Sequence, residues 1–484
     1  MKALVISSAY IGSSEAALIF IALIRNKYLA EHIGPAGFGV YGLLNSFFAM
    51  AAVIGGAWLV TGNSKYIAEY FKKSDLISVR KTHNFSLSLT LIISTFLTFI
   101  FFIFHNSILR AFLSEEVLLS YFFLFSAAFV GTSLRSILTS ILQGLVLIKE
   151  VVFLRIVSTL FDFISVLSLV YFFDLLGFFI SLLISSIFAL LLFFFRINKY
   201  TKIQIIIPNF KDDVSKKIAN FGFVNLFLAF INLGSQYLQR YIILINLGMP
   251  FVGLFQAAYS LMNYLGIVNR GTLFYYIPKM SEELNIVERN KMLNDYLRFT
   301  IFTGLPIALF AIIFSEFAIK TLYSKSFLTL GNIFFVFVIA QFIISIEYAV
   351  QSILVGTTSL KMHSVVTIIT HFIWIAVPFF YIKELGLISI GLSLAVASLI
   401  AITIDYIFLY HSYGIRILKR NLLMFLASII ILLSSTYIKE YNLLINILFG
   451  VAGSAIILVN IKKEEIVLIR SLFLQKLFKP YSSK

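Results

Sequence analysis

Residues 225–270 read NLFLAFINLGSQYLQRYIILINLGMPFVGLFQAAYSLMNYLGIVNR and contain two long apolar segments. Polar residues of the first segment recur at spacings that place them on one helical face, beside an arginine: Asn225, Asn232, Gln236, Gln239 and Arg240. The second segment has an equivalent stripe: Gln256, Ser260, Asn263 and Arg270. A helix that contacts only lipid would carry neither the amides nor the arginines, so each helix is predicted to have a water-facing side.

The remainder of the chain is as apolar as this stretch. Of the 484 residues, 60% are hydrophobic and only 12% are charged, and the mean hydropathy is +0.98. Apolar runs recur along nearly the whole length, each long enough for the roughly 20 helical residues that cross a hydrocarbon core. Unbroken runs of this kind exclude the short alternating strands of a membrane barrel. The sequence therefore predicts an all-α polytopic membrane protein.

About fourteen transmembrane helices are predicted, with both termini in the cytoplasm. The spans cover residues 4–30, 38–62, 84–108, 117–143, 151–172, 174–195, 218–245, 251–276, 299–319, 329–355, 361–382, 386–410, 421–438 and 443–460. Most of the 38 Lys and Arg residues lie at the amino end, in the even-numbered connections and in the tail, which the positive-inside rule assigns to the cytoplasm. The net charge of +16 thus follows from topology and from anionic headgroups, and no nucleic-acid partner is predicted.

The spans form an internal repeat. A shift of 214 residues lays the starts of spans 1–6 on those of spans 7–12, and it aligns Gly34 with Gly248 and Gly39 with Gly253. Both halves begin on the same side of the membrane, so the repeat is parallel, and such repeats hold substrate sites at their interface near the midplane. The predicted organisation is two six-helix lobes and two C-terminal helices: an N-lobe (1–196), a basic cytoplasmic linker (197–217), a C-lobe (218–412), two appended spans (413–460) and a basic amphipathic cytoplasmic tail (461–484).

A second group of charged residues lies within or beside the predicted spans and can serve either in ion coupling or in ion pairs: Glu15, Arg135, Asp162, Glu347 and His371. Glu15 either pairs with an arginine or carries a coupling proton. Arg135 and Asp162 on neighbouring helices are typical of a pair that holds a bundle together. His371 is either a hydrogen-bonded packing residue or a proton relay.

No motif of an enzyme is present. The sequence contains no phosphate-binding glycine loop, no HExxH, no nucleophile elbow and no carboxylate cluster with metal-ligand spacing. Cys is absent, which excludes disulfides and thiolate metal sites. We therefore predict neither enzymatic activity nor a metal or organic cofactor. A channel is disfavoured as well, since no repeated filter motif occurs.

The amino-terminal region resembles a known family. The motif GPAGFGVYG (Gly34 to Gly42), followed by a second span and a polar exit with Lys65 and Glu69, resembles the start of bacterial Wzx-type lipid-linked oligosaccharide flippases. These belong to the multidrug/oligosaccharidyl-lipid/polysaccharide exporter superfamily. The resemblance is strongest over the first 80 residues and is architectural beyond them.

The resemblance implies that an undecaprenyl-pyrophosphate-linked glycan crosses the bacterial inner membrane by alternating access through a central cationic cavity, with Na⁺ or H⁺ coupling. It implies a role in lipopolysaccharide or capsule synthesis and, as partners, the lipid bilayer and a polysaccharide polymerase or glycosyltransferases. Arginine suits a pyrophosphate, and amides suit sugar hydroxyls. We assign seven residues to the cavity: Arg25, Asn45, Gln236, Arg240, Gln256, Asn263 and Arg270.

Other functions stay open at the level of sequence. A flippase of peptidoglycan precursors is the closest alternative, and the sequence separates it poorly. An ion-coupled multidrug exporter of the same superfamily would require anionic residues facing its cationic substrates. A membrane scaffold without transport activity is disfavoured by the several polar helical stripes.

Overall fold

The computed structural model describes residues 2–114, 117–267, 285–356, 360–438 and 448–453, together with Thr272 and Met280. Helices account for nearly all of the ordered backbone in these ranges, and no strand occurs among them. The helices are α1 (Lys2–Gly55), α2 (Val60–Lys72), α3 (Leu76–Ile103), α4 (His105–Phe112), α5 (Leu119–Gly144), α6 (Ile148–Ile197), α7 (Asp213–Leu247), α8 (Met249–Leu265), α10 (Ile286–Ile313), α11 (Ser315–Leu322), α12 (Phe334–Gly356), α13 (Leu360–Leu385), α14 (Ile388–Tyr413) and α15 (Lys419–Ile438). Two 3₁₀ helices cover Ala57–Leu59 and Lys325–Asn332.

Ten of the described helices are long and apolar enough to cross a membrane, which confirms the prediction of an all-α membrane protein. Two of them each contain two helices joined at a kink: α1 covers the first two predicted spans, and α6 covers the fifth and sixth. Of the fourteenth predicted span only residues 448–453 are described, and the predicted tail lies outside the described residues. The count of fourteen spans stays a prediction.

The kinks have a local cause in the backbone. Gly34 has φ 61° and ψ −174°, a conformation open to glycine, and Pro35 follows it at the start of a new helical turn. Gly248, which joins α7 to α8, has φ 92° and ψ 172°. These two glycines are equivalent under the 214-residue shift, so both halves turn in the same way. Asp174 makes the kink in α6 at φ 46°, a strained conformation for a residue with a side chain.

Other elements recur between the halves. Helices α3 and α4 have 28 and 8 residues, and α10 and α11 have the same lengths 210 residues later. In α3 the Asn84 side chain accepts a hydrogen bond from the backbone N–H of Gln204 at 3.0 Å. In α10 the side chain of Asn294 accepts one from Leu418 at 2.8 Å. The segments that follow α6 and α14 are thus attached to equivalent helices, although the division into lobes at 1–196 and 218–412 stays a prediction.

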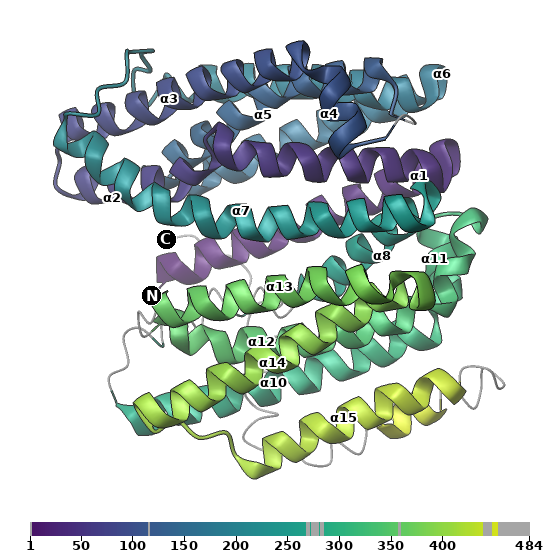
Figure 1. Cartoon of the computed structure of the whole chain (residues 1–484). Helices are drawn as coiled ribbons and strands as arrows, with labels where there is room; N and C mark the ends of the chain where they lie inside the picture. The colour runs from purple at the N-terminus through teal and green to yellow at the C-terminus, as the bar shows by residue number, and fades with distance from the viewer. Residues whose placement is uncertain are drawn as a thin grey trace, which may run out of the picture.

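Helices α1, α7 and α8 lie between two groups of helices (Figure 1). On one side α3, α5 and α6 pack against one another, and on the other α10, α12, α13 and α14 do so, with α15 beside α10. Helix α1 packs along α8 as well as α7, and α7 also packs along α13. The polar faces of α7 and α8 therefore meet α1 in the interior of the molecule.

Hydrogen bonds join the predicted linker at residues 197–217 to the N-terminal half of α3. The extended part of the linker donates a backbone hydrogen bond from Ile206 to Ser88, at 2.9 Å. Lys81 of α3 donates a hydrogen bond to Asp212 at 2.9 Å, and this bond holds the pKa of the Asp212 carboxyl below its ordinary value. Ile207 is almost fully exposed, at 92%, as expected for an apolar residue at a membrane interface.

Candidate functional site

Helices α1, α7 and α8 enclose a cavity of about 300 Å³, hereafter the central cavity. Its walls are Asn45, Ser46, Ala49, Leu233, Gln236, Arg240, Gln256, Tyr259, Ser260, Asn263 and Tyr264. Five of the seven residues predicted for a substrate cavity are among them: Asn45, Gln236, Arg240, Gln256 and Asn263. Helical periodicity placed four of these on the wet faces of two helices, and tertiary packing brings those faces together with α1.

Arg240 is the only cation in the wall of the central cavity as described, and it is 3% exposed. Its guanidinium donates two hydrogen bonds to Gln256 Oε1, at 2.7 Å from Nη2 and 3.2 Å from Nε. Nη1 donates a third to the backbone carbonyl of Gln236 at 2.9 Å. The rings of Phe255 and Tyr259 lie 5.1 and 5.3 Å from the guanidinium carbon. The guanidinium is therefore surrounded by neutral oxygens and aromatic rings.

No carboxylate pairs with Arg240 among the residues that the structure describes. A buried cation without an ion-pair partner costs at least about 2.5 kcal/mol on membrane-insertion scales. Cation–π contacts and charge-assisted hydrogen bonds offset part of this cost. The remaining positive potential favours an anion in the central cavity, and a guanidinium is well shaped to bind phosphate oxygens.

Glycines of the GPAGFGVYG motif make room for this arrangement. A Cβ on Gly42 would lie 2.9 Å from Gln256 Oε1, the atom that accepts from Arg240. A Cβ on Gly39 would lie 2.3 Å from the backbone oxygen of Met249, and one on Gly253 would lie 1.8 Å from that of Pro35. The motif therefore allows α1 and α8 to touch through their backbones, and it positions the amide beside the arginine.

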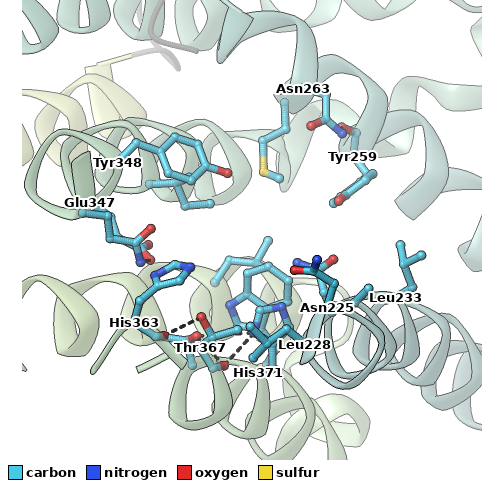
Figure 2. A pocket seen from close by; sticks show the side chains of 18 of the residues that line it. Asn225, Leu228, Leu233, Tyr259, Asn263, Glu347, Tyr348, His363, Thr367 and His371 are labelled. Carbon is cyan, nitrogen blue, oxygen red and sulfur yellow. Dashed lines mark hydrogen bonds between the residues drawn. The ribbon is translucent and has the colours of Figure 1, made fainter. Parts of the chain in front are cut away.

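A second cavity of about 550 Å³ adjoins the first, since both are lined by Leu233, Tyr259 and Asn263. We call it the histidine cavity, and its other polar walls come mainly from α7, α12 and α13: Asn225, Asn232, Gln341, Glu347, Gln351, His363, Thr367, His371 and Trp374. Figure 2 shows Glu347 and His363 toward one end of this cavity, and Tyr259 with Asn263 toward the other. The predicted coupling residues Glu347 and His371 thus line the same cavity.

Some polar side chains of the histidine cavity have hydrogen-bond partners, and others have an atom without one among the described residues. Glu347 accepts a hydrogen bond from Gln351 at 3.0 Å. His371 Nδ1 lies 2.8 Å from the carbonyl oxygen of Thr367, and its ring lies 4.4 Å from that of Trp374. Its Nε2 has no hydrogen-bond partner among the described residues, and neither does His363 Nδ1. Sequence reasoning did not select His363, although its spacing of four and eight residues from Thr367 and His371 marks a polar face on α13.

Contrary to the prediction, Arg25 does not line the central cavity. Its Nη1 donates to Asp162 Oδ2 at 2.7 Å, and both residues line a third cavity between α1, α2, α5 and α6. The neighbouring residue Asn26 is the one that faces α8, where it donates to the hydroxyl of Tyr264, a wall residue of the central cavity, at 3.1 Å. Adjacent residues on a helix point about 100° apart, so one of the pair had to face away from the centre.

The predicted pairing of Asp162 with Arg135 also requires correction. Asp162 forms its 2.7 Å ion pair with Arg25, across 137 residues of sequence. Arg135 lines the same cavity without an ion pair among the described residues. The side chain of Glu15 and the whole of Arg270 lie outside the described part of the chain, so their assignments stay predictions.

The family of the chain follows from comparison with known proteins. Residues 28–332, more than half of the sequence, match the family described as polysaccharide biosynthesis protein. The chain belongs to this family. It is a multi-pass membrane protein.

Solved structures show which fold this polysaccharide biosynthesis protein has. It is similar to the lipid II flippase MurJ in an inward closed conformation, with a TM-score of 0.75, 16% identity and coverage of 97% of this chain and 100% of that one. An inward-facing multidrug resistance MATE transporter of the MOP superfamily has a TM-score of 0.70 at 16% identity, covering 81% and 95%. A MOP transporter from Pyrococcus furiosus, whose binding pocket is described as of reverse polarity, has a TM-score of 0.64 at 13% identity, covering 84% and 95%. No curated protein sequence matches. The fold is that of the MOP superfamily.

Proposed function

We propose that this polysaccharide biosynthesis protein is a flippase that moves an undecaprenyl-pyrophosphate-linked oligosaccharide from the inner to the outer leaflet of the bacterial cytoplasmic membrane. The observation that carries the proposal is Arg240, a buried arginine without an ion-pair partner among the described residues, in a cavity walled by amides and tyrosines. Family membership supports the substrate class in general.

The walls of the central cavity suit the two ends of such a substrate headgroup. A pyrophosphate accepts bidentate hydrogen bonds from a guanidinium, which Arg240 can provide by exchanging the amide oxygen of Gln256 for phosphate oxygens. Sugar hydroxyls pair with amides, and sugar rings pack on aromatic faces, which Asn45, Asn263 and Tyr259 supply. Arg270, the second cation assigned from sequence, would add a further phosphate contact.

Alternating access is the proposed mode of movement. Fourteen spans in two parallel six-helix lobes would meet along α1, α7 and α8, and rocking of one lobe against the other would expose the central cavity to each leaflet in turn. The matching kinks at Gly34 and Gly248 support this arrangement. The positive-inside rule predicts that both termini lie in the cytoplasm, which in this proposal is the side where glycosyltransferases assemble the lipid-linked glycan.

Two alternatives have some support. Likeness to a lipid II flippase in fold favours a peptidoglycan-precursor substrate, which shares the pyrophosphate. Likeness to multidrug transporters favours a cationic drug, but the described walls of the central cavity contain an arginine and no carboxylate. A cation would meet repulsion there, so we rank the multidrug function last.

Deletion of the gene in its native host separates these functions. The proposed function predicts loss of a surface polysaccharide, with accumulation of its lipid-linked precursor on the inner leaflet, while cell-wall synthesis and sensitivity to cationic dyes stay normal. Export would be scored by glycan staining and by accessibility of the precursor to an added glycosidase. Arrested cell-wall growth would favour the peptidoglycan alternative, and dye sensitivity with normal glycan would favour drug export.

We also propose that an ion gradient of Na⁺ or H⁺ drives transport through Glu347, with the histidine cavity as its site. Glu347→Gln removes the ionisable group and keeps the shape of the side chain. The increase in lipid-linked glycan flux that an imposed gradient produces in proteoliposomes is therefore expected to fall at least about tenfold. Glu384→Gln, which changes an exposed acid at the end of α13, serves as the matched control. Glu15→Gln tests the other predicted carrier. A full gradient response in Glu347→Gln would remove this residue from coupling.

A further inference from the structure

The third cavity lies between α1, α2, α5 and α6, has a volume of about 550 Å³ and is called here the arginine cavity. Three arginines come together in it from three helical segments: Arg25, Arg135 and Arg155. Its other polar walls are Thr132, Ser136, Thr139, Gln143, Thr159 and Asp162. None of the functions assigned above uses this cavity.

The polar face of α5 is built around this space. Thr132, Arg135, Ser136, Thr139 and Gln143 recur at intervals of three and four residues, so they form one stripe along the helix, and every one of them lines the cavity. An arginine in contact with hydrocarbon would be costly, whereas one in a polar cavity is not. The stripe therefore faces an aqueous or ligand-filled space, not lipid.

The charges of the arginine cavity do not balance. Asp162 is the one carboxylate among its described lining residues, and it is engaged with Arg25 at 2.7 Å. Arg135 makes no hydrogen bond or ion pair through its guanidinium among the described residues. Three arginines against Asp162 leave an excess of two positive charges among the described lining residues, and counting Glu15 as a second negative charge would still leave an excess of one. The cavity thus attracts anions whatever the state of Glu15.

The arginine cavity is separate from the proposed pyrophosphate site. Helix α1 divides them: Arg25 faces the arginine cavity, and Asn26 faces Tyr264 in the central cavity. The hydroxyls of Thr132, Ser136 and Thr139 donate to backbone carbonyls of α5 in this structure, and each can rotate to donate to an oxyanion instead. The side-chain amide of Gln143 offers a further donor. A volume of about 550 Å³ accommodates a phosphate or a carboxylate sugar.

We propose that the arginine cavity is an oxyanion-binding site, in which Arg135 is the principal cation and Asp162 competes with the bound anion for Arg25. The oxyanion is a phosphate or a carboxylate, supplied either as a free ion or as an acidic substituent of a larger molecule. Binding at this site is independent of the proposed flippase activity, and its test requires no transport.

The test measures thermal unfolding of the full chain in nanodiscs against increasing sodium phosphate or sodium glucuronate, with ionic strength held constant by chloride. A ligand that binds the folded state raises the unfolding temperature as its concentration exceeds the dissociation constant. Arg135→Gln is expected to weaken oxyanion binding about tenfold or more, because a charge-assisted hydrogen-bonding group is lost, and Arg135→Lys should retain part of it. Arg80→Gln, which removes an exposed charge from the start of α3, is the matched control.

Asp162→Asn changes binding in the opposite direction. It releases Arg25 and removes the competing carboxylate, so the protein without anion should unfold at a lower temperature while oxyanions bind several-fold more tightly. A purely structural ion pair would lower stability without changing anion affinity. A response to phosphate alone points to the free ion, and one to glucuronate alone points to an acidic sugar; either supports the site. Equal titrations of Arg135→Gln, Asp162→Asn and the unmodified protein would overturn it, as would an equal loss in Arg80→Gln.

Discussion

Replacement of Arg240 with Ala is expected to abolish surface glycan while the protein remains folded and inserted at its normal level. Arg240 is the one cationic residue among the described walls of the central cavity. Its loss removes the charge-assisted contacts proposed for the pyrophosphate. Loss of such a contact costs about 3 kcal/mol or more, which reduces transport at least about a hundredfold. The rate of precursor flipping in proteoliposomes and the amount of surface glycan measure the effect.

The stability of this variant separates binding from folding. Arg240 has no ion-pair partner among the described residues, so its removal leaves no carboxylate orphaned and relieves the cost of a buried charge. The unfolding temperature of Arg240→Ala should therefore equal or exceed that of the unmodified protein. Arg240→Lys should restore part of the transport, since it keeps the charge but not the planar fork. Normal glycan export by Arg240→Ala would disprove the assignment of the central cavity, and Arg270→Ala tests the second predicted cation.

The second large effect is expected for Gly253→Ala, at the contact between α1 and α8. A Cβ at this position would lie 1.8 Å from the backbone oxygen of Pro35, so the two helices must separate. Overpacking of this kind costs about 1–3 kcal/mol, enough to shift an equilibrium between two conformations about fivefold or more. The closed contact between the halves should open, and glycan export should fall correspondingly.

Cysteine labelling measures this shift without background, because the chain contains no cysteine. Ser260 of the central cavity is replaced by Cys, and its reaction with a membrane-impermeant thiol reagent added from outside is compared with and without Gly253→Ala. Labelling should increase in the double variant. Gly234→Ala is the matched control, because its Cβ would meet only Met50 Sδ, at an ordinary 3.8 Å. Unchanged labelling and unchanged export in Gly253→Ala would show that this contact does not control access.

Helical periodicity alone identified much of the central cavity. Gln236 and Arg240 on α7, and Gln256 and Asn263 on α8, recur at spacings that share a face, and in a membrane helix such a face has to avoid lipid. The repeat, read from the spacing of apolar runs, anticipated the matching turns at Gly34 and Gly248. The first inference depends on residues close together in one helix, and the second on the order of apolar runs along the chain, so neither requires knowledge of tertiary contacts. The assignment of these residues to a substrate stays a prediction.

The remaining features depend on which helices are neighbours. Local pattern could not show that Asn26 and not Arg25 contacts the wall of the central cavity, since these neighbouring positions on α1 point in different directions. Local pattern also could not predict that Asp162 pairs with Arg25, because the two residues are more than a hundred positions apart. For the same reason it could not predict that Arg135 lines the arginine cavity without an ion pair among the described residues. The sequence by itself determined that this is a helical membrane protein with polar helical faces, since hydropathy and spacing are local properties. Only the tertiary structure decided which faces meet, because ion pairs and cavities arise from the packing of helices that are distant along the chain.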